Sequence, residues 1–519
     1  MKKKIIYVPL DERPCNYDFP SLIAADTDVE LVRPPLSWMG NKKLPGRIDT
    51  IWEWVLEQAP GAYGAILSMD TLLYGGIVPS RLHSETEQAC SDRLSRLRQL
   101  KESNPSLVVY AFHLIMRCPR YSSSDEEPDY YGQWGETIFN IGDLQHRLEL
   151  GLAADLEMEA RALEKLSAEV PKEALDDYVS RRAVNRAANE RSIELAAEGV
   201  IDFMIVPQDD SAPYGWTAKD QMRIRERIHQ LEADLDVYMY PGADEAGCTL
   251  LARMLNQIQG TKPAVYPRFS SVDGPSVIPL YEDRPLLESL KYQIIAAGGI
   301  VASSAAEADL VLLVNSPGGK MEEASQQSQV SLEYGTRRNV IELSEFGEYV
   351  LRNLGKPCAV ADVAYANGAD LKLLRLLRQK NMLFELAGYA GWNTSSNTIG
   401  TVLAQSMAYL LYGASRSHFD FLALRLVEDA GYCSSVRGKL SGGPIQQLGW
   451  NYFEADGVRG KVSGLVREEL ESFVSECIED GRHKVLIQDC WLPWNRMFEV
   501  GLKVQYADND VPSEIDPAG

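Results

Sequence analysis

The sequence lacks the patterns that mark several common classes of protein. Its eight cysteines are scattered over 519 residues without a Cys-x-x-Cys pair. Neither a disulfide framework nor a zinc finger is therefore indicated, and isolated thiols suit a reducing compartment. There is also no Gly-x-Gly-x-x-Gly motif and no Walker lysine motif, which disfavours dinucleotide and P-loop nucleotide binding. We therefore predict that the protein works without a cofactor.

Positive charge and long apolar runs are scarce as well. The chain has 52 Lys and Arg residues and 74 Asp and Glu residues, which give a formal net charge of -22. Nucleic acids and anionic membranes bind basic patches, so we expect neither as a partner. No apolar stretch approaches the roughly 18 residues of a membrane span, and Ile5–Leu10 is too short for a signal peptide core. We expect a soluble, cytoplasmic protein, and leave a homo-oligomer open.

The apolar residues that are present predict an α/β fold. They make up 45% of the chain, enough for a sizeable core. Short apolar runs alternate with amphipathic segments, and the predicted strands centre near residues 5, 31, 66, 109, 204, 238, 311, 359 and 385. This alternation predicts a parallel sheet. Eight or nine such units suit a (β/α)8-barrel-like sheet better than an open one. We predict a barrel-like catalytic domain over residues 1–412, with an inserted helical hairpin at about 142–198, and a mostly helical region over 413–519.

The chain around residues 202–216 is the most informative stretch. Phe203–Val206 is short, apolar and ended by a proline, which predicts a buried strand. The strand delivers two adjacent carboxylates, Asp209 and Asp210, into a loop of small residues. Loops at the carboxyl ends of strands bind ligands in α/β proteins. A capped turn beside a solvated carboxylate would explain the pair about as well.

Other predicted strands also end in acidic residues. Asp11 follows the first strand, Asp70 the third, and the pair Asp244–Glu245 the strand near residue 238. The carboxyl ends of parallel strands lie at one edge of a sheet, so we expect Asp11, Asp70, Asp209 and Asp244 on one rim. A long loop over residues 118–135 is rich in Ser, Asp and Tyr. Loops of this length are often functional, and its aromatic residues favour a lid over the substrate.

This combination of side chains is typical of sugar sites. Sugar rings stack on aromatic faces, hydroxyl groups bond to carboxylates and amides, and two carboxyl groups act on the glycosidic bond. One carboxyl must stay protonated near neutral pH, which burial and a neighbouring negative charge favour by raising its pKa. We therefore predict a glycoside hydrolase for a small sugar or glycoside, with 2-acetamido sugars among the candidates. The predicted catalytic residues are Asp209, Asp210, Asp244 and Glu245; the predicted substrate-binding residues are Asp11, Arg13, Asp70, Tyr74, His113, Tyr214, Trp216, Trp392, Asn393 and Asn397.

Four motifs together resemble one bacterial family. They are Pro-Leu-Asp-Glu-Arg-Pro at 9–14, Pro-Gln-Asp-Asp at 207–210, Pro-Gly-Ala-Asp-Glu at 241–245 and Ala-Gly-Trp-Asn-Thr at 390–394. The family is a domain of unknown function of about this length, and the resemblance spans nearly the whole chain. Because the family has no established activity, the resemblance supplies no catalytic residues.

Two shorter resemblances bear on the chemistry. Gly-Ala-Asp-Glu at 242–245 resembles the Gly-Gly-Asp-Glu signature of barrel β-N-acetylhexosaminidases. This resemblance implies that Glu245 is the general acid and that Asp244 orients the substrate's own acetamido nucleophile. Ala243 replaces the second glycine, and Tyr240 stands where the signature has an upstream histidine. Asp209–Asp210 resembles the paired aspartates of O-GlcNAc-hydrolase-type enzymes, so the choice between the two pairs stays open.

Two other classes of function remain as alternatives. A metal-dependent hydrolase could use Asp11, Asp70, His113 and Asp209 as hard ligands. The sequence has no His-x-His or His-x-x-x-His spacing to support it, and a single histidine after a strand is more often a core residue. A non-catalytic sugar-binding protein would need the same aromatic and polar groups, without the acid–base chemistry.

Overall fold

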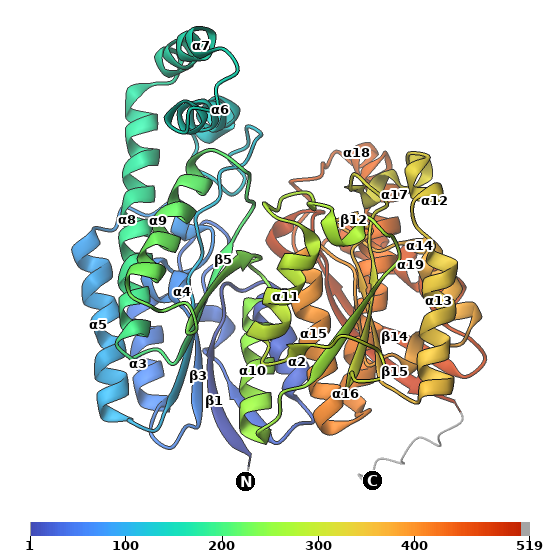
Figure 1. The fold of residues 1–519 in the computed structure, drawn as a ribbon. Helices are drawn as coiled ribbons and strands as arrows, with labels where there is room; N and C mark the ends of the chain where they lie inside the picture. The colour runs from blue at the N-terminus through green and yellow to red at the C-terminus, as the bar shows by residue number, and fades with distance from the viewer. Residues whose placement is uncertain (1, 510–519) are drawn as a thin grey trace. The chain divides into compact units, whose positions relative to one another are not determined.

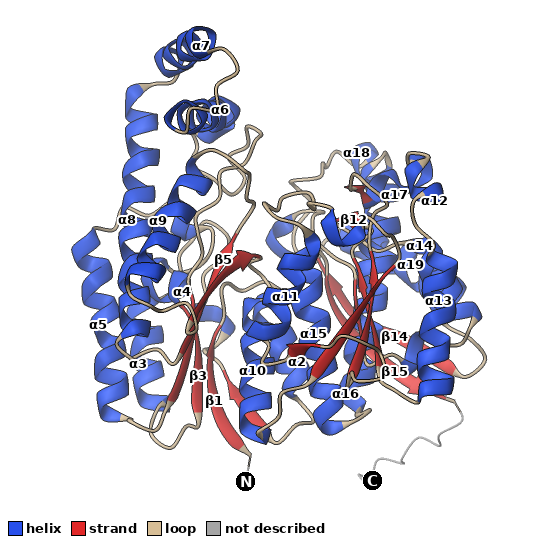
Figure 2. Ribbon diagram, viewed as in Figure 1, coloured by secondary structure: helices blue, strands red, loops and turns tan. Residues whose placement is uncertain are grey.

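The computed structural model describes residues 2–509, and the chain divides into two compact units. The first comprises Met1–Met254 with Tyr281–Arg284, and the second comprises Leu255–Leu280 with Pro285–Gly519. Each unit has its own parallel sheet with helices packed against it (Figures 1 and 2). This division differs from the predicted boundary near residue 412, because the strands after residue 254 pair with one another. Residues 510–519, at the end of the predicted C-terminal region, lie outside the described part.

The first unit is built on a six-stranded sheet with the order β2-β1-β3-β4-β5-β6, in which every neighbouring pair is parallel. Its strands are β1 (Lys3–Val8), β2 (Val29–Val32), β3 (Gly64–Ser68), β4 (Val108–Phe112), β5 (Phe203–Gln208) and β6 (Val237–Pro241). Ligands of such doubly wound sheets bind beyond the carboxyl ends of the strands. Asp11, Asp70, Asp209 and Asp244 follow β1, β3, β5 and β6, which confirms the expected common rim.

Helices cover both faces of this sheet. Strands β3 and β5 are buried at every position, as expected for parallel strands covered on two sides. On one face Leu67 and Val206 belong to the same core as helix residues Trp52, Leu97 and Ile224. On the other face the guanidinium of Arg253 lies 3.5 Å from the centre of the Phe203 ring. The helices are α1 (Pro14–Tyr17), α2 (Phe19–Ala24), α3 (Ile48–Gln58), α4 (Met69–Tyr74), α5 (Glu87–Ser103), α9 (Trp216–Gln230) and α10 (Ala246–Gln259).

Three further helices are inserted between β4 and β5. They are α6 (Tyr131–Glu149), α7 (Leu156–Glu169) and α8 (Lys172–Ala197), and α6 and α7 lie beyond the sheet at one end of α8 (Figure 1). The insertion has a small core of its own that includes Tyr131, Ile138 and Tyr178. The predicted hairpin at about 142–198 is therefore a three-helix insertion that begins earlier. The sequence marked the charged, Ala-rich part of the insertion and missed the first part of α6, residues 131–141, whose buried positions include Tyr131, Ile138 and Ile141.

The second unit contains a five-stranded parallel sheet with the order β13-β11-β9-β7-β8. If these five strands are numbered 1 to 5 in chain order and the sheet is read from β8, their order is 2-1-3-4-5. The first five strands of the first sheet, β2-β1-β3-β4-β5, have the same order. Its strands are β7 (Ala264–Phe269), β8 (Ile300–Val301), β9 (Leu310–Asn315), β11 (Cys358–Asp362) and β13 (Gly388–Ala390). A short parallel pair, β10 (Glu322–Glu323) and β12 (Tyr365–Ala366), and an antiparallel pair, β14 (His483–Trp491) and β15 (Gly501–Asp508), complete the strands.

The second unit also contains α-helices. They are α11 (Leu286–Ala296), α12 (Glu333–Thr336), α13 (Val340–Tyr349), α14 (Leu371–Gln379), α15 (Ser395–Tyr412), α16 (Arg416–Arg425), α17 (Arg437–Ser441), α18 (Pro444–Gln447) and α19 (Lys461–Phe473). A π-helical stretch, Leu426–Val436, follows α16. None of the helices within residues 2–509 is long and apolar enough to cross a bilayer.

The α/β class and the parallel pairing are confirmed. The strands that the sequence assigned to one barrel-like sheet are divided between two sheets, with β2 and β6 at the edges of the first. The strand predicted near residue 385 is displaced: Leu383–Glu385 forms a single 3-10 turn, and β13 begins at Gly388.

Candidate functional site at the carboxyl edge of the first sheet

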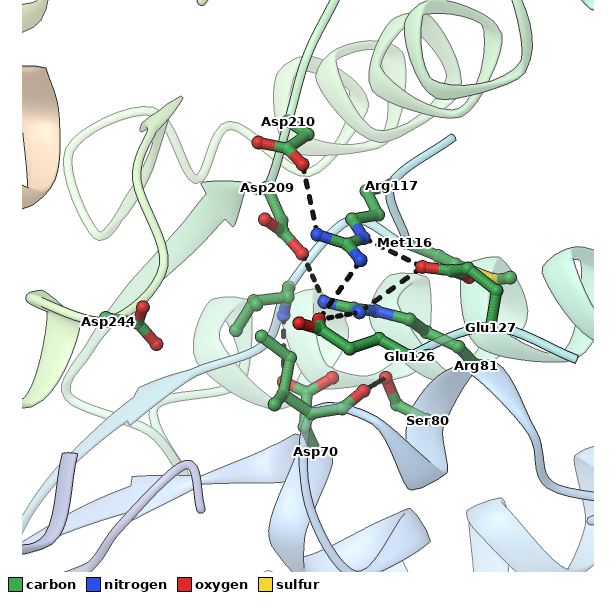
Figure 3. A network of polar contacts seen from close by, with 12 residues as sticks. Asp70, Ser80, Arg81, Met116, Arg117, Glu126, Glu127, Asp209, Asp210 and Asp244 are labelled. Carbon is green, nitrogen blue, oxygen red and sulfur yellow. Dashed lines mark hydrogen bonds and ion pairs between the residues drawn. The ribbon is translucent and has the colours of Figure 1, made fainter. Parts of the chain in front are cut away.

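Two arginines organise the polar side chains beyond β3, β4 and β5 (Figure 3). Arg81 follows α4, and Arg117 follows β4. Arg81 donates to Glu126 at 2.9 Å and to Glu127 at 3.3 Å. Arg117 donates to the same two carboxylates, at 3.0 Å and 2.8 Å. The two guanidiniums are thereby fixed side by side by a pair of adjacent glutamates.

Each arginine also holds one of the two predicted catalytic aspartates. Arg81 Nη2 lies 2.7 Å from Asp209 Oδ2, and Arg117 Nη1 lies 3.1 Å from Asp210 Oδ2. The side chains of Asp209 and Asp210 are 14% and 25% exposed, whereas that of Arg81 is 2% exposed. The aspartate pair is therefore on the solvent side of the network, where a substrate can reach it.

Asp210 occupies an unusual environment. Its φ of 31° lies in the left-handed region, which is uncommon for a residue other than glycine and clusters at functional sites. Burial, reinforced by the negative charge of Asp209, raises the pKa of Asp210 to about 6, although Arg117 opposes the shift. Two neighbouring carboxyl groups with different partners can divide the roles of acid and base between them.

Asp70 is a second carboxyl group with a raised pKa at this edge. It lies in the first turn of α4, which Ser68 caps by accepting from the Thr71 amide. Burial raises the pKa of Asp70 to about 7, and the hydrogen bond from the Leu114 amide to Asp70 Oδ2, at 3.0 Å, only partly offsets this. Asp70 is thus a buried group that can take up or release a proton near neutral pH.

Asp11 and Asp244 form a separate cluster around Arg13. Arg13 Nη2 lies 2.6 Å from Asp11 and 2.6 Å from Asp244. The amide of Asn16 donates to both carboxylates as well, at 3.0 Å and 2.9 Å. Burial raises the pKa of Asp11 to about 7 against the opposing charge of Arg13. Asp244 lies apart from Asp209 in Figure 3, and its contact with Arg13 joins the loops after β1 and β6.

Glu245 is buried and supports its own loop. Its Oε2 accepts a hydrogen bond from the Ala243 amide at 2.8 Å, and it is only 1% exposed. Gly242 has a φ of 143°, and a β-carbon there would lie 1.9 Å from Glu245 Oε1. The glycine therefore leaves the space that the glutamate carboxylate fills.

Two predicted binding residues, Tyr74 and His113, lie in the core of the first unit. His113 Nδ1 contacts the Ser192 hydroxyl of α8 at 3.1 Å, and burial lowers the pKa of His113 to about 3. The Tyr74 ring stacks on His83 with 4.3 Å between ring centres. His113 is therefore neutral at physiological pH and serves the packing of α4 and α8 beneath the site.

The aromatic residues after Asp210 pack against the inserted helices. Trp216 Nε1 donates to the Ile138 carbonyl of α6 at 2.9 Å. The Tyr214 ring meets His146 edge-on, with 6.1 Å between ring centres. These rings link the loop after β5 to α6 and so fix the position of the aspartate pair.

The remaining predicted residues belong to the second unit. Trp392 is buried, and its indole nitrogen lies 3.3 Å from the Thr401 hydroxyl. Asn393 has a φ of 50° and accepts a hydrogen bond from the Asn367 amide through its carbonyl. Asn397 lies in the first turn of α15, where its amide donates to the capping Thr394. These three residues shape the turn between β13 and α15.

One known family matches nearly the whole chain. The family model described as "Protein of unknown function (DUF4127)" matches residues 5–503. The chain belongs to this family. The membership predicted from the four motifs is therefore confirmed, while the shorter resemblances to the two glycosidase groups stay predictions. No curated protein matches the chain.

The four side chains considered for a metal site do not converge. Asp11 contacts Arg13, Asp70 accepts from the Leu114 amide, and Asp209 contacts Arg81. Within residues 2–509, no group of three or more His, Cys, Asp or Glu side chains is placed to hold a metal ion. Asp11 and Asp209 are instead paired with arginines, and Asp70 with a backbone amide.

Sequence reasoning missed most of the network that holds the aspartates. Arg81, Glu126 and Glu127 were not predicted, although Glu126 and Glu127 lie in the long loop that was expected to be functional. Its aromatic residues gave that expectation, yet Tyr131 is buried in the core of the insertion. The adjacent acids were the better signal, because buried glutamates require basic partners.

The second unit carries a buried polar network at the same edge of its sheet. Asn315 donates to Asp362 at 2.8 Å and to Asp370 at 3.2 Å, and Arg338 donates to Asp370 at 2.8 Å. Burial raises the pKa of Asp362 to about 7, with Asp370 adding to the shift. The network was not predicted from the sequence, where these residues appear as isolated polar positions after strands.

Proposed function

We propose that the protein is a glycoside hydrolase that acts on a small sugar or glycoside through Asp209 and Asp210. The observation that carries the proposal is the pair itself: two adjacent, partly exposed carboxyl groups at the carboxyl edge of the sheet, each held by a different arginine. Glycosidic bonds are cleaved by two carboxyl groups of which one donates a proton. The eight cysteines are all thiols, which supports a cytoplasmic location.

The environments of the two aspartates suggest their roles. A pKa of about 6 leaves a fraction of Asp210 protonated near pH 7, as a general acid requires. Arg81 stabilises negative charge on Asp209 at 2.7 Å, which suits a carboxylate that acts as base or that orients a nucleophile. Glu245, the other candidate acid, is buried against its own loop. We therefore favour the Asp209–Asp210 pair over Asp244–Glu245.

A screen with 4-nitrophenyl glycosides of both anomeric configurations, including 2-acetamido sugars, tests the proposal. We expect turnover of at least one glycoside, unchanged by a chelator. Asp210→Asn should lower kcat by about 10²–10⁴-fold on a glycoside with a poor leaving group, and much less with an activated aryl group, because general-acid help is lost. Asp49→Asn, at an exposed ion pair with Arg96, is the control.

Four results would reject the proposal. Sugar binding without turnover would indicate a binding protein, and turnover abolished by a chelator would indicate a metal-dependent hydrolase. Equal loss on both kinds of leaving group would show that Asp210 is not the acid. If Glu245→Gln rather than Asp210→Asn shows the dependence on the leaving group, the acid belongs to the other pair.

A further inference from the structure

A cleft of about 490 Å³ in the first unit is lined by the segments that follow β2 and β4. It is lined by Asn41, Lys42, Lys43, Ser124 and Asp125. One wall is the tight turn 41–44, closed by hydrogen bonds between Asn41 and Leu44 at 3.0 Å and 2.9 Å. The other wall is the segment that continues into Glu126 and Glu127. The volume is in the range of small-molecule sites.

Both walls connect directly to the candidate site. The Lys42 amide donates to Glu12 Oε1 at 2.7 Å, and Glu12 stands between Asp11 and Arg13 in the chain. Asp125 precedes Glu126, which binds both Arg81 and Arg117. The cleft is thereby joined to both networks through Glu12 and Glu126.

Lys42 is held in a strained and fixed position. Its φ of 52° lies in the left-handed region, a conformation that a non-glycine residue keeps only when its surroundings impose it. Its ammonium group pairs with Asp125 across the cleft, and each of the two side chains is only 19% exposed. The pair joins the two walls and cancels the charge of Asp125 inside the cleft.

Lys43 is in a different situation. Its ammonium group lies 3.2 Å from Asp129, whose side chain is 99% exposed. Ion pairs with fully exposed carboxylates contribute little stability, because water competes for both charges. Lys43 can therefore exchange Asp129 for an anionic ligand. Among the five lining residues, Lys42 and Asp125 neutralise each other, and Lys43 carries the remaining positive charge beside Asn41 and Ser124.

We infer that this cleft is a subsite for an anionic group, so that the substrate is an acidic sugar carrying a carboxylate, phosphate or sulfate. The inference deepens the proposed function and rests on it for the chemical step. A neutral sugar would leave the Lys43 charge without a ligand partner, whereas an anionic one gains a charge-assisted hydrogen bond. The anion would bind at Lys43 while the glycosidic bond lies toward Asp209 and Asp210.

The test compares glycosides that differ in one anionic group: 4-nitrophenyl glucosides, glucuronides, and glucosides phosphorylated or sulfated at the 6-position, each in both anomeric forms. We expect an anionic member to have the lowest KM. Lys43→Met, which removes the charge and keeps the stem, should raise that KM about tenfold, corresponding to about 1.4 kcal/mol, and leave kcat and the KM of neutral glycosides unchanged. Asp129→Asn, which removes the competing carboxylate, should lower the KM of the anionic glycoside.

The control is Lys165→Met, at an exposed lysine on α7 that also pairs with a glutamate. It should leave every KM unchanged. A lower KM for neutral glycosides than for all anionic ones, or a KM insensitive to Lys43→Met, would overturn the subsite while leaving the proposed hydrolysis intact.

A binding measurement separates the subsite from catalysis. The measurement is the thermal stabilisation of the unmodified protein and of Lys43→Met, which needs no turnover. The sugars compared are glucuronic acid, glucose 6-phosphate, glucose 6-sulfate and glucose. If an anionic sugar stabilises the unmodified protein and not the variant, the subsite stands even if no glycoside is hydrolysed. If glucose stabilises both proteins as well as the anionic sugars do, the subsite is rejected. Inorganic phosphate and sulfate at matched ionic strength show how much of the effect the anion alone provides.

Discussion

Asp11 and Asp244, which are 233 positions apart in the sequence, share two hydrogen-bond donors. Arg13 Nη2 and Asn16 Nδ2 each donate to both carboxylates, at distances between 2.6 and 3.0 Å. The contact joins the loops after β1 and β6, strands that stand four places apart in the sheet order. Removing the shared cation would leave two carboxylates facing each other in a buried position.

We therefore expect Arg13→Leu to destabilise the protein by about 3–5 kcal/mol, the usual result of removing one partner from a buried ion pair. Urea unfolding measures the change. Arg96→Leu, which breaks the exposed pair with Asp49, should cost less than about 1 kcal/mol. Equal effects of the two substitutions would show that the Arg13 cluster is solvated rather than buried.

Asp70 should make stability depend on pH. Its pKa is raised from 3.8 to about 7 by burial, so between these values the folded state keeps a proton that the unfolded state has released. The contribution of Asp70 to stability is therefore fully present below about pH 4 and is lost as the pH rises through 7. Asn at this position can still accept from the Leu114 amide and does not ionise.

The stability of Asp70→Asn relative to the unmodified protein should accordingly rise by about 2–3 kcal/mol between pH 5 and pH 8. Unfolding curves for both proteins across this range measure the difference. Asp49→Asn is the matched substitution at an exposed site. A difference that does not change with pH would mean that Asp70 stays ionised in the fold.

Two substitutions should move the pKa of Asp210 in opposite directions. Asp209→Asn removes the neighbouring negative charge and should lower the pKa of Asp210 below about 6, whereas Arg117→Gln removes the opposing cation and should raise it. Titration of labelled aspartate carboxyl carbons by NMR follows the group directly. Arg120→Gln is the control. Arg120 stacks on Phe139 instead, so this substitution should leave the pKa of Asp210 unchanged. Shifts of the same sign would mean that the two groups do not act through their charges.

Gly242→Ala should cost more stability than Gly61→Ala. Both glycines have a positive φ, 143° and 74°, so both substitutions strain the backbone. A β-carbon at Gly61 meets nothing within 4 Å, whereas one at Gly242 would displace the Glu245 carboxylate from the Ala243 amide. Loss of a buried hydrogen bond adds about 1–3 kcal/mol. Chemical denaturation compares the two variants, and equal costs would show that Glu245 moves aside freely.

The sequence located most strands because their signal is local. The strands predicted near residues 31 and 359 are β2 and β11, and each is a short, mostly apolar run followed by polar residues. The common rim of Asp11, Asp70, Asp209 and Asp244 followed from parallel pairing alone. Which strands pair is decided by contacts between distant residues, so the sequence could not show that β7 begins a second sheet.

The partners of the acids could not be predicted for the same reason. Arg81 and Asp209 are 128 positions apart, and Arg13 and Asp244 are 231 apart. A carboxylate at a strand end indicates an edge site, but whether it faces an arginine, an amide or solvent depends on which loops the fold brings together. Aromatic residues were misleading here, since Trp216 and Tyr214 pack on α6 rather than beside the aspartate pair.

The three-helix insertion delays the completion of the first sheet during synthesis. Residues 113–202 separate β4 from β5, its only neighbour on that side within the described strands. At about 5–20 residues per second, a ribosome needs roughly 5–20 s to translate this segment. For that interval the edge of β4 has no partner strand, and open edges invite pairing with other chains. The core formed by Tyr131, Ile138 and Tyr178 can assemble meanwhile, before β5 leaves the ribosome.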